Sequence, residues 1–133
     1  MRFGPLPPSF TNIYSLDFDG IDDYVDCGDS NDFSFGNGTT DSPFSISAWV
    51  KMTSASNFRI VSKSNNTNGN SEYLFFVDSS KQVSLILYSA LSVNRYRGRK
   101  YNITLSSYEG QWVNLITTYD GQGGINAQNG IKI

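Results

Sequence analysis

The chain of 133 residues contains no histidine and a single cysteine, Cys27. The absence of histidine removes the commonest general base, the catalytic triads that depend on it and most transition-metal sites. One cysteine excludes an internal disulfide and any zinc site made of several cysteines. Cys27 is therefore interpreted as a small, half-buried apolar residue.

Charged residues are scarce, at 17% of the chain, and no apolar run is long enough to cross a membrane. The first ten residues contain three prolines and lack the apolar run of a signal peptide. Residues 1–50 hold eight Asp and one Arg, whereas residues 51–133 hold four acidic and nine basic residues. The two halves therefore either attract each other or form an acidic and a basic face.

Short segments with strand-like alternation, separated by turn residues, fill most of the chain, and no segment has a helical period. In residues 44–51, Phe44, Ile46, Ala48 and Val50 share one face. Other strands are predicted at 12–18, 24–27, 58–63, 73–77, 83–88, 95–101, 112–119 and 131–133. Residues 1–11 are predicted to be a Pro-rich extended arm and 12–133 a single domain. This pattern predicts an all-β sandwich or jelly roll.

Four runs carry a family resemblance: LDFDGIDDYV (16–25), FSISAWVK (44–51), IVSK (60–63) and QWVNLITTYDG (111–121). In this order they resemble LamG-like, concanavalin A-like jelly-roll domains, closest to modules of bacterial and phage surface proteins. The resemblance implies an antiparallel two-sheet jelly-roll sandwich that is truncated at the C-terminus, because family members continue with further strands. Two explanations remain open. Either the chain is a fragment of a longer protein, or another chain supplies the missing C-terminal strands in an oligomer.

Glycosidases of the superfamily need a pair of carboxylates. The two glutamates, Glu72 and Glu109, are far apart in the sequence, and no Glu-x-Asp-x-x-Glu run is present. A non-catalytic role is therefore predicted.

Three carboxylates surround a predicted turn at Gly20, namely Asp19, Asp22 and Asp23. Asp and Gly are common turn residues, so these side chains can simply be solvated. The resemblance instead implies calcium as a cofactor, held by these three residues and Asp120. Both interpretations remain open.

The most basic run is VNRYRGRKY (93–101). In a strand, Arg95, Arg97 and Arg99 would lie on one face, and Tyr96 and Lys100 on the other. Guanidinium groups suit sulfate or carboxylate, and tyrosine offers a stacking surface. The candidate glycan-binding residues are Arg95, Tyr96, Arg97, Arg99, Lys100 and Tyr101. Alternatively, the run is a solvated strand or a contact to the acidic half. Nucleic acid is not expected as a partner, because the whole chain is acidic.

Two functions follow as hypotheses. The first is a non-catalytic recognition or adhesion module that binds glycan on an extracellular or virion surface. The second is a structural protein of a phage particle, such as a capsid decoration or tail component, that contacts neighbouring protein subunits. Trp49 and Trp112 lie within predicted strands and are interpreted as core residues rather than sugar-binding platforms.

Overall fold

The computed structural model describes residues 13–37, 39–64, 71–89 and 92–133. The predicted arm at 1–11 lies outside these residues. Within them the chain forms seven strands and three short 3-10 helices. The strands are β1 (Phe44–Lys51), β2 (Phe58–Lys63), β3 (Tyr73–Val77), β4 (Val83–Ser89), β5 (Ser92–Lys100), β6 (Trp112–Tyr119) and β7 (Ile131–Lys132). The helices are η1 (Asn31–Phe33), η2 (Ser106–Tyr108) and η3 (Gly124–Gly130).

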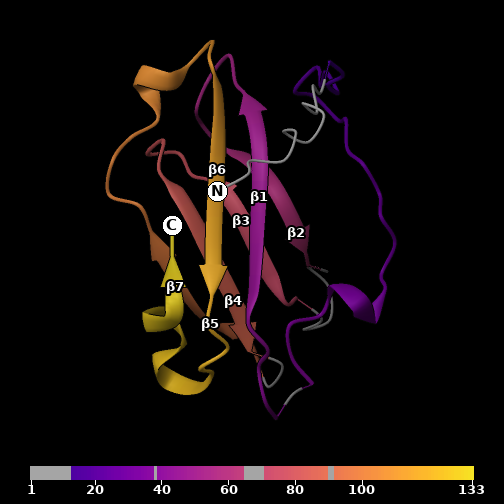
Figure 1. The fold of residues 1–133 in the computed structure, drawn as a ribbon, viewed down its shortest axis with the longest axis vertical. Coiled ribbons are helices and arrows are strands. Elements are labelled where there is room, and N and C mark those ends of the chain that lie inside the picture. The colour runs from indigo at the N-terminus through magenta and orange to yellow at the C-terminus, as the bar shows by residue number, and fades with distance from the viewer. Residues whose placement is uncertain (1–12, 38, 65–70, 90–91) are drawn as a thin grey trace, which may run out of the picture.

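The strands form two antiparallel sheets, one in the order β1-β6-β7 and the other in the order β2-β3-β4-β5. Figure 1 shows the three-stranded sheet in front of the four-stranded sheet, so that the two sheets form two layers. The predicted all-β sandwich is therefore confirmed.

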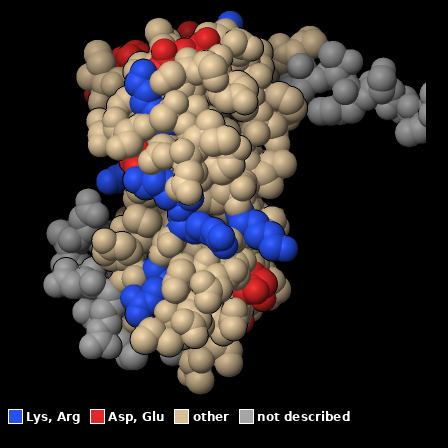
Figure 2. Space-filling view, turned by 90° about the vertical axis from the view of Figure 1, so that its left-hand side faces the viewer, with Lys and Arg blue, Asp and Glu red and all other residues tan. Residues whose placement is uncertain are grey.

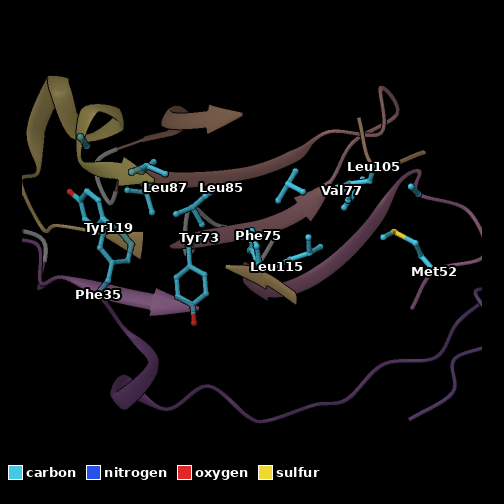
Figure 3. Packing of buried hydrophobic residues seen from close by; sticks show 14 residues of the cluster. Phe35, Met52, Tyr73, Phe75, Val77, Leu85, Leu87, Leu105, Leu115 and Tyr119 are labelled. Atoms are coloured by element: carbon cyan, nitrogen blue, oxygen red, sulfur yellow. The ribbon is translucent and has the colours of Figure 1, made fainter. Parts of the chain in front are cut away.

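Alternation along the strands directs one face of each sheet into a shared core. On β3 and β4 the buried side chains are Tyr73, Phe75, Val77, Val83, Leu85 and Leu87. From the other sheet, Leu115 and Tyr119 meet them, as Figure 3 shows. The core thus consists of aliphatic and aromatic side chains from both layers.

An aromatic cluster at one end of the core anchors the loop before β1. The ring of Phe35 lies 5.5 Å from that of Phe44, 6.3 Å from that of Tyr73 and 5.8 Å from that of Tyr119, measured between centroids. The Tyr119 hydroxyl donates a hydrogen bond to Asp41 Oδ2 at 2.6 Å. Phe35 and Asp41, which precede β1, are therefore fixed to the sandwich by ring packing and by a hydrogen bond.

The strands predicted at 12–18 and 24–27 are wrong, because the described residues 13–29 form no strand. The large apolar side chains of this segment are exposed, and so is Cys27, which was expected to be half-buried. A strand needs a partner strand as well as an alternating sequence. None of the described strands pairs with this segment.

The burial expected for the two tryptophans is also wrong. Trp49 is 68% exposed and Trp112 is 52% exposed, because both lie on the outer face of the three-stranded sheet. Each sheet of a two-layer sandwich buries one face only. A position within a strand therefore does not decide whether a side chain is buried.

Candidate functional site

The basic run forms strand β5 at the edge of the four-stranded sheet, and the predicted alternation holds for its described side chains. Arg97 lies opposite Leu87, and Arg99 lies opposite Leu85, both of which point into the core. Tyr96 lies opposite Tyr88 on the outer face. The run therefore divides between the two faces of the sheet.

The two inward-facing arginines bind the chain's own backbone. Arg97 Nε donates to the carbonyl oxygen of Ile125 at 2.9 Å, and Arg99 Nη1 donates to that of Ile131 at 2.9 Å. These carbonyls belong to η3 and β7, so the arginines connect the edge of one sheet to the C-terminal segment. The side chain of Arg95 lies outside the described part of the structure.

The outer side of β3, β4 and β5 is the candidate site, and we call it the tyrosine face. Register places Phe76, Ser84 and Lys100 in one row across these strands, with Ile86 and Gly98 in the next row. Its residues are Phe76, Ser84, Ile86, Tyr88, Tyr96, Gly98 and Lys100. Arg59 on β2 extends the first row, since it lies opposite Phe76.

Aromatic rings and bare backbone lie side by side on the tyrosine face. Tyr96 is 57% exposed, and its ring centroid lies 6.3 Å from that of Tyr88. At Gly98 a Cβ would lie only 2.9 Å from the carbonyl oxygen of Leu85, so close packing favours glycine there. The exposed backbone of Gly98 thus separates the ring of Tyr96 from the ammonium group of Lys100.

Lys100 is held on the tyrosine face by Asp78, whose Oδ2 lies 2.5 Å from Nζ. The other oxygen of Asp78 accepts the N–H groups of Ser80 and Gln82 in the β3–β4 turn. Partial burial raises the pKa of the Asp78 carboxyl, but Lys100 and these N–H groups outweigh it and lower the pKa overall. Asp78 therefore remains ionised and fixes the position of the ammonium group.

Ser84 lies between Phe76 and Lys100 and is 4% exposed. Its Oγ has no hydrogen-bond partner among the described residues. A buried hydroxyl without a partner is uncommon in proteins. Ser84 Oγ is thus a polar atom of the tyrosine face that makes no hydrogen bond with the described residues.

Sequence reasoning identified Tyr96 and Lys100 but missed their cross-strand neighbours Ser84, Ile86 and Tyr88. The signal was available, because the Asp78–Lys81 turn predicts the β3–β4 hairpin and alternation then places these three residues on one face. Tyr101 follows β5, and its N–H donates to the carbonyl of Val83 at 2.8 Å.

Lys and Arg side chains form a band across the side of the molecule on which β5 and β7 lie (Figure 2). Asp and Glu side chains lie beside this band at several points (Figure 2). The band gives the neighbourhood of β5 a positive field, although the whole chain has a net charge of -2. Such a field attracts anionic groups at low salt.

The predicted calcium ligands are only partly brought together. Side-chain oxygens of Asp19, Asp22 and Asp23 lie within 4.8 Å of one another, and all three residues are exposed. Asp19 Oδ1 accepts the N–H of Ile21, and Asp23 Oδ2 accepts the N–H of Asp19, each at 2.8 Å. Asp120, which follows β6, is not in this group and accepts the N–H of Gln122.

Calcium prefers six to eight oxygen ligands. The three clustered carboxylates supply part of such a set, and two of them also stabilise the turn. Calcium binding therefore stays a prediction from the sequence.

Both glutamates bind lysines of the same chain. Glu72 Oε1 lies 2.9 Å from Lys63 Nζ, and Glu109 Oε1 lies 3.0 Å from Lys81 Nζ. Glu109 Oε1 also accepts the backbone N–H of Ala55 at 2.9 Å. This hydrogen bond, followed by the ion pair, lowers the pKa of Glu109.

No helix in the described part of the chain is long and apolar enough to cross a membrane.

A family model described as the concanavalin A-like lectin/glucanases superfamily matches residues 19–133. No curated protein and no solved structure matches the chain significantly. The matched residues include all seven strands of the sandwich. The chain is therefore a member of the concanavalin A-like lectin/glucanases superfamily.

Proposed function

We propose that the chain is a non-catalytic carbohydrate-recognition module that binds acidic glycan on the tyrosine face. The observation that carries this proposal is the exposed ring of Tyr96 beside the bare backbone of Gly98 and the ammonium group of Lys100. The lectin-like superfamily supports carbohydrate as the ligand class.

The chemistry of this face suits a charged sugar. The C–H face of a pyranose ring can stack on an exposed tyrosine, and the lack of a side chain at Gly98 lets the sugar approach the sheet. A sulfate or carboxylate group on the sugar would then bind Arg59 and the N–H groups of Lys100 that do not bind Asp78. Binding by so few charges should weaken as salt concentration rises.

A non-catalytic role is supported by the contacts of the two glutamates. Glu72 and Glu109 each bind a different lysine, Lys63 and Lys81. A glycosidase instead positions two carboxylates on either side of one glycosidic bond. We place the module on an extracellular or virion surface, where glycans are encountered.

A structural role in a phage particle is the second candidate. The described segment 13–25 exposes large apolar side chains, and exposed apolar residues close together favour contacts between proteins. Among the described strands, β1 and β2 each have one hydrogen-bonded neighbour, so strand addition is possible at either edge. This role predicts an oligomer that binds no sugar.

A glycan array at low salt tests the proposal with the unmodified chain and the Tyr96→Ala and Lys100→Ala variants. The expected result is binding to sulfated or carboxylated glycans, reduced about tenfold or more by either substitution. Tyr108→Ala is the matched control, because Tyr108 is an exposed tyrosine on η2 and is not a residue of the tyrosine face. Equal loss in the control, or no binding by the unmodified chain, would contradict the proposal.

A further inference from the structure

We propose that the outer face of β1 and β6 is a second carbohydrate site, which takes neutral glycan chains on Trp49 and Trp112. This inference rests on the proposed function, since it assumes that the module binds carbohydrate. It assigns this second site to the three-stranded sheet, and its ligand is a neutral rather than an acidic sugar. In Figure 1 this face is turned toward the viewer.

The two tryptophans are neighbours across the strand pair. Register places Trp49 opposite Asn114, and Trp112 opposite Lys51, so the two indoles are diagonal neighbours on one face. Diagonal neighbours in an antiparallel pair are about 7–8 Å apart, which is within reach of aromatic side chains. Both side chains are more than half exposed. Ile116, also exposed, continues the apolar surface along β6.

Polar side chains alternate with these rings. Ser47 and Asn114 are joined by a hydrogen bond, with Nδ2 of Asn114 3.1 Å from Oγ of Ser47. Each tryptophan therefore has a hydrogen-bonding residue directly opposite it, Asn114 for Trp49 and Lys51 for Trp112. A sugar ring presents the same combination, with apolar C–H groups on its face and hydroxyl groups around its rim.

This composition argues for a sugar rather than a protein as the occupant. The centre of a protein interface is depleted of charged residues and forms a continuous apolar surface. Here Asn114 lies between Trp112 and Ile116 along β6, and Trp49 lies between Ser47 and Lys51 along the outer face of β1. Binding sites for small molecules combine aromatic surface with a few polar groups that fix orientation.

The scarcity of charge on this face argues for neutral sugars. The outward residues of the two strands are Ser45, Ser47, Trp49, Lys51, Trp112, Asn114, Ile116 and Thr118. Lys51 is the one charged residue of this set, and Lys132 on β7 lies at the other end of the face, opposite Thr118. The tyrosine face holds Arg59 and also Lys100, which pairs with Asp78. The two sheets would thus select different sugars.

Tryptophan fluorescence tests the inference directly, because Trp49 and Trp112 are the chain's only tryptophans. The unmodified chain is titrated with neutral oligosaccharides, namely cellohexaose, xylohexaose and mannohexaose, and iodide quenching is measured before and after. The expected result is strong quenching by iodide in the free chain and protection by at least one of these sugars.

Two outcomes would overturn the inference. Weak quenching in the free chain would mean that segment 13–25 or a second copy covers the tryptophans, and the oligomeric state measured by light scattering separates these cases. Strong quenching that none of the three sugars changes would show that the exposed rings do not bind them.

Variants separate this inference from the proposed function. Trp49→Ala and Trp112→Ala should each weaken neutral-sugar binding about tenfold, in the range found for losing an aromatic stacking partner. Both should leave the binding of a heparin hexasaccharide unchanged. Tyr96→Ala should weaken the binding of the heparin hexasaccharide and leave neutral-sugar binding unchanged. If heparin binds and neutral sugars do not, this inference alone fails. If neither binds, the proposed function fails as well.

Discussion

Arg99 on β5 donates a hydrogen bond to the carbonyl oxygen of Ile131 on β7, at 2.9 Å. The two strands belong to different sheets, so this contact joins the layers at one side of the sandwich. Arg97 makes a similar contact with Ile125. Part of the basic run thus stabilises the fold, while on its other face Tyr96 is exposed and Lys100 pairs with Asp78.

Arg99→Ala should lower the free energy of unfolding by about 1–2 kcal/mol, because the carbonyl of the buried Ile131 loses a charged donor. Urea denaturation measures the change. Arg59→Ala is the matched control, because Arg59 is exposed on the outer face of β2 and should cost much less. Equal losses in the two variants would show that the contact to Ile131 does not stabilise the fold.

Tyr119→Phe should destabilise the chain by about 1–3 kcal/mol. The hydroxyl group donates to Asp41 and accepts the N–H of Gly123 at 2.7 Å, so its removal leaves two polar groups without this partner. Thermal or chemical denaturation at neutral pH provides the measurement. A Phe variant as stable as the unmodified chain would contradict the role assigned to this hydroxyl.

Because of Tyr119, we also expect the folded chain to lose stability at alkaline pH. Burial, together with the hydrogen bond to Asp41, raises the pKa of Tyr119 to about 12. Because the folded state holds the proton more tightly than the unfolded state does, this stabilisation is complete below pH 10 and is lost between about pH 10 and 12. Burial also raises the pKa of Tyr73, so tyrosinate absorbance should show more than one late-titrating tyrosine, of which one is missing in Tyr119→Phe. Identical titration curves would refute this assignment.

Lys63→Met should lower the free energy of unfolding by about 1–3 kcal/mol. The side chain is 13% exposed, and its Nζ lies 2.9 Å from Glu72, 2.7 Å from Ser34 Oγ and 3.0 Å from the Ser30 carbonyl oxygen. The substitution leaves Glu72 without its cation, so adding Glu72→Gln should recover part of the loss. If the double variant is no more stable than Lys63→Met, the ion pair is not the cause.

Acid should weaken the β3–β4 turn through Asp78. Because the folded state lowers the pKa of this carboxyl, its contribution to stability is present above the ordinary pKa of about 4 and is lost as pH falls further. Asp78→Asn should therefore flatten the fall in stability between about pH 4 and pH 2. An unchanged acid profile in this variant would assign the loss to other carboxylates.

The strands of the sandwich could be predicted from the sequence where alternation coincides with a partner strand. Residues 44–51 and 112–119 were predicted with the bounds that they have as β1 and β6. The same reasoning failed at 12–18, because an alternating sequence does not show whether another strand lies beside it.

For the candidate site, alternation predicted which residues share a face but not what each face meets. It placed Arg97 and Arg99 together, but it did not predict that they bind the carbonyl oxygens of Ile125 in η3 and of Ile131 in β7. It likewise separated Trp49 from the core-facing residues of β1, but burial depends on the second layer. Contacts between layers arise from packing over long sequence distances, which no local pattern encodes.

The most direct test of the tyrosine face is a titration with a heparin hexasaccharide at low salt, followed by backbone amide chemical shifts. We expect the largest shifts on β4 and β5 around Ile86, Tyr96 and Gly98, with smaller ones near Lys100. Shifts confined to the Asp19–Asp23 turn, or no shifts at all, would contradict carbohydrate recognition by this face.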